Sequence, residues 1–272
     1  MTIYSYSRLT VYEQCPLKFK FRYIDKLIPE FEKTLESHLG SIVHQTLEWF
    51  YIQIKEKNIT PDIEQMMMYY SKKWEENFTE EIKNVKKELT EKDYFNKGIK
   101  FLVDYYLKNK PFKDNTLEVE KRVTINLGEN GKHKLQGFID RLSYNPETDE
   151  FEIHDYKTAN NLPQKKKIKG DKQLALYSIA VKELFGKDKK VCLTWHYLSH
   201  NLKVQVRKTE EEIEELKKEI IRLIRKIEEE KEFPYKKSAL CQWCGYKKIC
   251  PAWKPETREL EKFPTIRKYI KD

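Results

Sequence analysis

Residues 135–158 read LQGFIDRLSYNPETDEFEIHDYKT and predict two strands joined by a tight turn. The turn lies at 145–149, where Asn, Pro, Glu, Thr and Asp are residue types that favour turns. Asp140 ends an apolar run in the first strand, and Asp155 and Lys157 continue the alternation of the second. Because successive strand side chains point to opposite faces, Asp155 and Lys157 are expected on one face of the predicted sheet.

Two carboxylates on neighbouring strands beside a lysine are typical of a divalent-metal site, since Mg²⁺ and Mn²⁺ prefer oxygen ligands. A metal there would polarise a phosphoryl oxygen and lower the pKa of a water, and Lys157 would orient that water or offset developing charge. The alternative is a hairpin with two exposed acids and a solvated lysine. The sequence GFID at 137–140, at hairpin spacing from DYK at 155–157, favours the metal site.

The composition places limits on the class of protein. The 272 residues suffice for one elaborated domain, or for a core with a helical insertion. The 53 Lys+Arg against 44 Asp+Glu give a net charge of +9, which favours polyanionic partners, although basic proteins without such partners are common. No apolar run of about 18 residues occurs, so no membrane span is expected. The N-terminus lacks a signal-peptide pattern, which predicts a cytoplasmic protein whose five cysteines bind metal rather than form disulfides.

Further helices and strands are predicted around this hairpin. Residues 40–51 predict a helix whose apolar stripe flanks His44, a position that more often holds a core or surface histidine than a ligand. Residues 60–110 read as a helical insertion that covers or walls a cleft. Alternation predicts a strand at 117–127, leading into a three-strand meander. Beyond it we expect a helix at 171–184, a strand hairpin at 190–207 and a charged helix at 209–230.

Basic segments supply the candidates for nucleic-acid contact. Residues 18–23, KFKFRY, interleave aromatic rings that stack bases with cations that track phosphates, but a helix with an aromatic core stripe explains them equally well. The lysines at 165–167 form a basic loop that is either solvated or holds a nucleic-acid backbone. The DNA-binding candidates are Arg8, Lys165, Lys166 and Lys167.

The C-terminal part carries a C-x2-C pair, Cys241 and Cys244, followed by Cys250. Zinc or an iron–sulfur cluster normally needs four ligands, and Cys15, itself followed by proline, is the candidate for the fourth. Such a centre would join the two ends of the chain. The spacing alone leaves zinc and iron–sulfur open.

The order of these motifs resembles the RecB-like branch of the PD-(D/E)XK nuclease superfamily in its iron–sulfur form. That branch includes the nuclease domains of AddB-type helicase–nucleases and RecB-like exonucleases associated with CRISPR loci. The matching motifs span almost the whole chain: Ser5-x-Ser7 to Cys15-Pro16, Gly40-x-x-x-His44, Gly137-x-x-Asp140, Asp155-Tyr156-Lys157-Thr158, Gln173-x-x-x-Tyr177 and the C-terminal cysteines.

The resemblance implies an α/β fold with a restriction-endonuclease-like core, in the order helix–three strands–helix–strand, around a mixed sheet. It implies a single nuclease domain over 1–272, with a helical insertion at 60–110. A cysteine segment at 232–255 would pair with Cys15, so that an iron–sulfur cluster staples the termini.

The resemblance also implies roles for individual residues. His44, Asp140, Asp155 and the backbone carbonyl of Tyr156 would bind Mg²⁺ or Mn²⁺. The catalytic set would be Asp140, Asp155, Lys157, Gln173 and Tyr177. Glu120 is an additional acidic candidate that matches the family's pattern poorly. The ligands of a 4Fe-4S cluster, favoured over zinc, would be Cys15, Cys241, Cys244 and Cys250.

The expected function is a metal-dependent DNA nuclease, an exonuclease that acts on single-stranded or unwound DNA ends in repair, recombination or CRISPR adaptation. The sequence has no Walker-type phosphate loop, so unwinding would need a helicase partner, and a CRISPR-adaptation protein is another candidate partner. Two alternatives stay open. One is a non-catalytic DNA-binding subunit of a helicase–nuclease complex, and the other is a zinc-stapled protein unrelated to nucleic acid.

Overall fold

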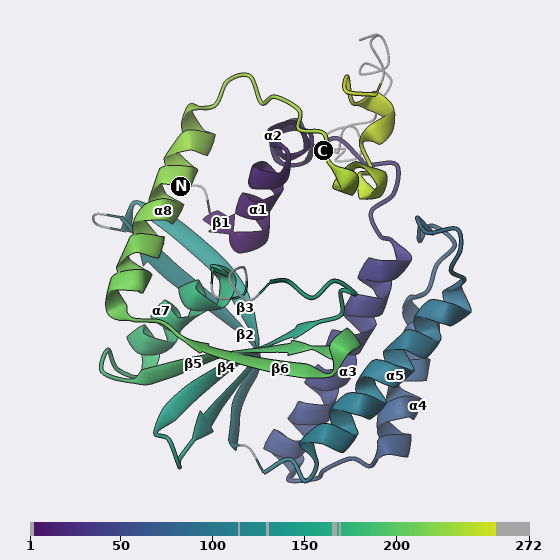
Figure 1. Ribbon diagram of the computed structural model, residues 1–272, viewed down its shortest axis with the longest axis vertical. Coiled ribbons are helices and arrows are strands. Elements are labelled where there is room, and N and C mark those ends of the chain that lie inside the picture. Colours follow the sequence, from purple (N-terminus) through teal and green to yellow (C-terminus); the bar gives the residue numbers. More distant parts are fainter. Residues whose placement is uncertain (1–2, 114, 129–130, 165–167, 169, 254–272) are drawn as a thin grey trace, which may run out of the picture.

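The computed structural model describes residues 3–113, 115–128, 131–164, 168 and 170–253. A six-stranded mixed sheet forms its centre, with helices packed on both faces (Figure 1). The strands are β1 (Ile3–Ser5), β2 (Asn115–Leu127), β3 (His133–Asn145), β4 (Glu150–Lys157), β5 (Lys190–Tyr197) and β6 (Leu202–Arg207).

Three strands pair with β3. β2 runs antiparallel along one edge of β3, from Asn115 opposite Tyr144 to Leu127 opposite His133. β1 pairs in parallel with residues 134–136 and β4 pairs antiparallel with residues 141–145, so β1 and β4 share the other edge. Residues 137–140 lie between these two partners, and the sheet forks there. β5 continues the sheet parallel to β4, and β6 runs antiparallel to β5.

The helices form two layers. They are α1 (Tyr6–Gln14), α2 (Pro16–Phe19), a π-helix (Lys20–Ile24), α3 (Leu35–Lys57), α4 (Ile63–Asn77), α5 (Glu91–Asn109), α7 (Gln173–Phe185) and α8 (Glu210–Glu229). α1, α7 and α8 share a core with Ile139 and Ile153 of the sheet. α3, α4 and α5 pack side by side around a second core, which Tyr156 of β4 joins from the other face (Figure 1).

The sequence of α3 fixes both of its ends. Thr34 and Ser37 form a capping box, with N–H to hydroxyl distances of 2.8 and 3.3 Å. Asn58 ends the helix in the left-handed conformation, at φ 53°, which asparagine adopts more readily than most residues. The buried stripe between these ends includes Ile42 and Val43, so His44 lies at its edge and can reach the sheet.

Most of the predicted elements are confirmed. The meander is β2–β3–β4, the predicted helix at 171–184 is α7, and the hairpin at 190–207 is β5–β6. The helix expected at 40–51 is longer, because its capping box lies at Thr34. β1 was not predicted, since three residues of strand leave no periodic pattern.

The segment at 18–23 packs into the protein. Phe19 and Phe21 are 1% and 4% exposed, which favours the core-stripe interpretation over base stacking for these two rings. Residues 60–110 contain α4 and α5, as expected, and their status as an insertion stays a prediction. Among the described residues, no helix is long and apolar enough to cross a membrane.

Candidate active site

The fork in the sheet positions Asp140. This residue ends the part of β3 that lies between β1 and β4, and its Oδ2 accepts a 3.0 Å hydrogen bond from the backbone N–H of Tyr156. Gly137 opens the same segment. A Cβ atom there would lie 2.3 Å from the Tyr177 hydroxyl, so only glycine lets α7 approach the fork this closely. The Gly137-x-x-Asp140 motif therefore combines a packing requirement with a carboxylate.

α3 brings His44 to the same point from the other face of the sheet. The helix packs closely at Gly40, where an added Cβ atom would lie 3.2 Å from Thr158 Oγ1. His44 Nε2 lies 2.7 Å from the carbonyl oxygen of Tyr156, and Nδ1 lies 3.4 Å from Asp140 Oδ2. A carbonyl oxygen only accepts, so this contact assigns the proton to Nε2. In the neutral imidazole, the lone pair of Nδ1 then faces Asp140.

Glu120 completes a group of three possible ligands. Ligand atoms of His44, Glu120 and Asp140 all lie within 4.8 Å of one another. The β2–β3 register explains this, because Val119 pairs with Arg141 and Lys121 with Ile139, which leaves Glu120 opposite Asp140. An open hollow surrounds the group and is lined by Ser37, Gly40, Ser41, His44, Gln45, Glu48, Glu120 and Asp140.

Both carboxyl groups of this set hold their protons more tightly than usual. Burial and repulsion from Asp155 raise the pKa of Asp140 to about 6, against the opposing effect of His44. Burial and repulsion from Asp140 and Glu48 raise the pKa of Glu120 to about 7. Close carboxylates with raised pKa values are typical of sites that a cation can neutralise.

The donor set fits a hard divalent cation. Two carboxylates and an imidazole are ligands that Mg²⁺ and Mn²⁺ accept. The carbonyl of Tyr156 accepts a hydrogen bond from His44, and its predicted role as a ligand stays a prediction. The neighbouring Lys157 is paired with Asp155, so it does not neutralise Glu120 and Asp140 by direct contact. A cation between Nδ1 of His44 and the two carboxylates would remove the repulsion that raises their pKa values.

Asp155 and Lys157 form a second, adjoining pair on β4. Lys157 Nζ lies 2.8 and 2.7 Å from the two oxygens of Asp155, as the alternation of the strand predicts. Burial alone would lower the pKa of Lys157, but the charges of Asp155, Asp171 and Asp140 raise it overall. Lys157 is therefore a fixed cation at neutral pH. Asp155 lies outside the group of three ligands, although its charge acts on Asp140.

α7 also contacts Lys157. Gln173 Oε1 accepts a 3.3 Å hydrogen bond from Lys157 Nζ. Tyr177, one turn later on the same face, interacts with Gln173 and with the backbone at Phe138, and burial raises its pKa. Gln173 therefore lies next to Lys157, and Tyr177 lies next to Gly137. The catalytic roles of both residues stay predictions.

Asp171 also belongs to this neighbourhood and was not a candidate from the sequence. Its Oδ1 accepts a 2.9 Å hydrogen bond from the N–H of Gln173, and burial raises its pKa while Lys157 lowers it. The sequence offered no specific signal for it, because the N-cap position of α7 is Lys172 and not Asp171. Its electrostatic contact with Lys157 depends on the packing of α7 against β4.

Of the predicted DNA-binding residues, only Arg8 lies in the part of the chain that the structure describes. Arg8 lies over three aromatic rings, with its guanidinium carbon 5.2, 5.4 and 4.8 Å from the centroids of Tyr4, Phe19 and Tyr23. A role for Arg8 in DNA binding stays a prediction. Lys165, Lys166 and Lys167 lie outside the described residues.

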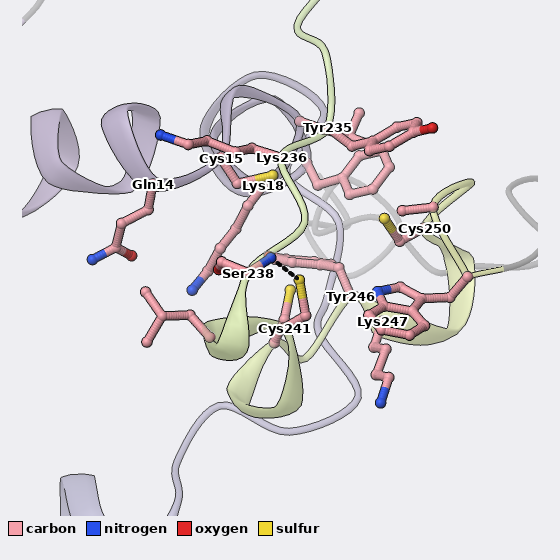
Figure 2. A pocket seen from close by; sticks show the side chains of 16 residues that line it. Gln14, Cys15, Lys18, Tyr235, Lys236, Ser238, Cys241, Tyr246, Lys247 and Cys250 are labelled. Atoms are coloured by element: carbon pink, nitrogen blue, oxygen red, sulfur yellow. Dashed lines mark hydrogen bonds between the residues drawn. The ribbon is translucent and has the colours of Figure 1, made fainter.

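The four predicted cluster cysteines line one apolar hollow between the two ends of the chain. Figure 2 shows Cys15, Cys241 and Cys250 around it, with the N–H of Ser238 bonded to the Cys241 sulfur at 3.4 Å. Burial raises the pKa of Cys244 and of Cys250, and the other thiols of the group add to this. Among the described residues, no three of these sulfurs lie within 4.8 Å of one another.

The fifth cysteine lies apart from this group. Cys192 is fully buried in β5, as predicted for a small core residue. The four cysteines that line the hollow form no disulfide. Cys15 directly precedes α2, and the other three lie in or directly after two short 3₁₀ helices between residues 239 and 250.

Comparisons with known proteins gave one matching family and several similar structures. The model of the PD-(D/E)XK nuclease superfamily matches residues 3–251. Similar solved structures include the crystal structure of SSO0001, with 14% identity, a TM-score of 0.43, and coverage of 92% of this chain and 86% of that one. Another is "Putative exonuclease" from Eubacterium rectale, with 16% identity, a TM-score of 0.46, and coverage of 88% and 86%. No curated protein matches the chain.

Proposed function

Because the chain belongs to the PD-(D/E)XK nuclease superfamily, we propose that it is a Mg²⁺- or Mn²⁺-dependent deoxyribonuclease that hydrolyses the phosphodiester bond. The observation that carries the proposal is the convergence of His44, Glu120 and Asp140 at the fork of the sheet, directly beside the Asp155–Lys157 pair. His44, Asp140, the Tyr156 carbonyl and Asp155 would hold the cation, with Glu120 as a further ligand. A bound cation would polarise a phosphoryl oxygen and lower the pKa of a water.

The chain's own residues supply the remaining chemistry. Lys157 stays protonated, so it would place a fixed positive charge against the phosphate as negative charge develops there. It is thus an electrostatic group rather than a general base. Gln173 and Asp155 fix the position of its ammonium from two sides, which keeps that charge aimed at the fork. Tyr177 packs against Gly137 and holds α7 at this distance.

The substrate is proposed to be single-stranded DNA or an unwound end, cleaved from a terminus. The hollow beside His44 is open to solvent, so a DNA end would have access to the candidate metal site there. The net charge of +9 favours a polyanion. A helicase or a CRISPR-adaptation protein would supply the unwound end, within repair, recombination or CRISPR adaptation.

The cysteine hollow is proposed to hold a 4Fe-4S cluster with a structural role. The support for this proposal is that Cys15, Cys241, Cys244 and Cys250 line one hollow, as the family resemblance implies for cluster ligands. The apolar surroundings are suited to excluding water from such a group.

A cleavage assay tests the proposed activity. End-labelled single-stranded DNA is incubated with the parent protein and with Lys157→Ala and Asp140→Asn, in Mg²⁺, in Mn²⁺ and in EDTA. We expect metal-dependent cleavage by the parent and a loss of at least about 100-fold in both variants, because Lys157→Ala removes a positive charge that stabilises the transition state and Asp140→Asn weakens the site of the cation. DNA binding should change much less.

The matched control for the lysine is Lys190→Ala. Lys190 lies at the opposite end of the β4–β5 ladder from Lys157, so its replacement should leave the cleavage rate unchanged. DNA binding without metal-dependent cleavage by the parent would reject the nuclease and favour a non-catalytic DNA-binding subunit. Undiminished cleavage by both site variants would reject the assigned residues.

A further inference from the structure

A pair of stacked aromatic rings connects α3 and α4 at the edge of the helical core. Trp49 of α3 and Tyr69 of α4 have centroids 4.4 Å apart and planes that differ by 9°. Neither ring is fully buried. Tyr70 and Trp74 of the same helix, by contrast, are 0% and 2% exposed and belong to the core. The Trp49–Tyr69 pair is thus a flat aromatic surface with partial access to solvent.

The pair adjoins the hollow of the candidate active site. Gln45 lines that hollow, and Trp49 follows it by four residues, on the same face of α3. Trp49 is five residues from His44, so it lies about 7.5 Å along the helix axis and about 140° around it. A nucleotide that follows the one at the fork would therefore reach the pair past Gln45 and Glu48, which line the hollow.

The charges around the pair favour a neutral group over a phosphate. Glu48 lines the hollow, and its charge acts on both Glu120 and Tyr69. Burial raises the pKa of Glu48, but an ionised Glu48 would repel a phosphate that approached Trp49. An uncharged base carries no such penalty. Lys73 Nζ lies over the Tyr69 ring, 5.8 Å from its centroid, and is paired with Glu76 at 2.6 Å.

We propose that the Trp49–Tyr69 pair is a stacking platform for a nucleobase of single-stranded DNA. The base would stack against the part of this pair that is open to solvent, while the adjoining phosphate lies at the fork. A base in a duplex is already stacked on its neighbours and cannot do this without being unpaired, so the platform selects single strands. This inference rests on the proposed nuclease function and names the part of the substrate that α3 and α4 would contact.

The first measurement is the binding of an oligothymidylate to the parent, Trp49→Ala, Tyr69→Ala and Trp49→Phe in EDTA. Loss of one base–aromatic stack is worth about 1–3 kcal/mol, so we expect a Kd at least about fivefold weaker for the two alanine variants. Trp49→Phe keeps a ring and should stay close to the parent. The weakening should persist between about 50 and 200 mM salt, because stacking releases no counterions.

Intrinsic fluorescence gives a direct readout of the contact. DNA should quench part of the parent's tryptophan emission, and Trp49→Phe should lose that quenching although it still binds. Met68→Ala is the matched control, since Met68 is a 66% exposed apolar residue directly before Tyr69. It should change neither the Kd nor the quenching. Unchanged affinity in both alanine variants, or full quenching in Trp49→Phe, would overturn the platform.

Hydrolysis of bis(p-nitrophenyl) phosphate separates this inference from the proposed function, because that diester has no nucleobase. The expected result is equal hydrolysis by the parent and by Trp49→Ala, which also shows that the variant is folded. Hydrolysis by both with no change in DNA affinity would reject the platform and keep the nuclease. Absence of metal-dependent hydrolysis by the parent, on the diester and on DNA alike, would reject the nuclease itself.

Discussion

Glu120 reaches the candidate metal site from a backbone conformation that glutamate rarely adopts. Its φ is +46°, in the left-handed region, and this lies within an antiparallel ladder whose register shifts between Thr116 and Glu118. A non-glycine residue in that region costs about 1–3 kcal/mol, and such strain often marks functional positions. The strain orients a carboxylate toward His44 and Asp140 that a regular strand would place differently.

Replacement of Glu120 tests whether that carboxylate binds the metal. Glu120→Gln should raise the Kd for Mn²⁺ by at least about tenfold, the lower end of what even an indirect ligand partner contributes. Calorimetry or Mn²⁺ paramagnetic resonance measures this in the absence of DNA. Glu118→Gln is the matched control, because Glu118 lies two residues earlier and is paired with Lys55 and Lys121. Equal affinity in Glu120→Gln and the parent would exclude Glu120 as a ligand.

At the scale of single elements, β4 shows how much of the site could be predicted. Its alternation was sufficient to place Asp155 beside Lys157, because that relation depends on one strand only. The proximity of Glu120 to Asp140 depends on the register between β2 and β3, and β1 depends on a parallel pairing with residues 134–136. Neither leaves a local pattern, so periodicity cannot predict them. The approach of His44 was implied only by the resemblance.

The opposite face of β4 carries a buried polar layer that the sequence did not indicate. His154 Nδ1 lies 3.0 Å from His196 Nε2 of β5, and Ser143 Oγ lies 2.8 Å from His154 Nε2. Burial, together with the charges of Arg141, Lys203 and Lys108, lowers the pKa of His196 well below its usual value. Burial and Arg141 lower the pKa of His154 in the same direction. Both histidines are therefore neutral in the folded protein near pH 6.

This predicts an acid-sensitive contribution to stability. Below about pH 6.5 the unfolded chain protonates both histidines and the folded protein does not, so stability is lost as pH falls. Each histidine contributes a slope of up to about 1.4 kcal/mol per pH unit. His196→Gln should make the slope of the unfolding free energy shallower by about that amount between about pH 5 and 6. Urea unfolding at a series of pH values measures it.

The comparison between variant and parent isolates this effect. The raised pKa values of Asp140 and Glu120 contribute in the opposite direction, since those groups hold protons in the folded state that they release on unfolding. They are present in both proteins, so they cancel in the difference. His200→Gln, which alters an exposed histidine, is the matched control. An identical slope in His196→Gln and the parent would contradict a lowered pKa of His196 in the folded protein.

At the scale of the whole molecule, the cysteine segment packs against residues 27–31, which lie in the linker between the N-terminal helices and α3. Glu30 N–H donates to the Gly245 carbonyl at 2.8 Å, and the Tyr246 hydroxyl donates to the Leu27 carbonyl at 3.0 Å. A Cβ atom at Gly245 would lie 2.7 Å from the Phe31 carbonyl oxygen, so this contact requires glycine. The linker that leads into the helix of His44 is thus part of the same small core as the cysteines.

Cys15→Ser tests whether a cluster joins the two ends of the chain. A cross-link across more than 100 residues is worth about 5 kcal/mol in the chain-entropy account, and each kcal/mol corresponds to about 2–4 °C in a protein of this size. We therefore expect the anaerobically purified variant to lose its iron and to melt about 10 °C or more below the parent. Cys192→Ala is the control, because it removes a buried thiol outside the hollow and should retain iron.

An unchanged melting temperature and iron content in Cys15→Ser would exclude Cys15 as a ligand. If the parent protein is colourless and contains stoichiometric zinc, the centre is a zinc ion and the proposed iron–sulfur cluster is rejected, because only the cluster absorbs visible light.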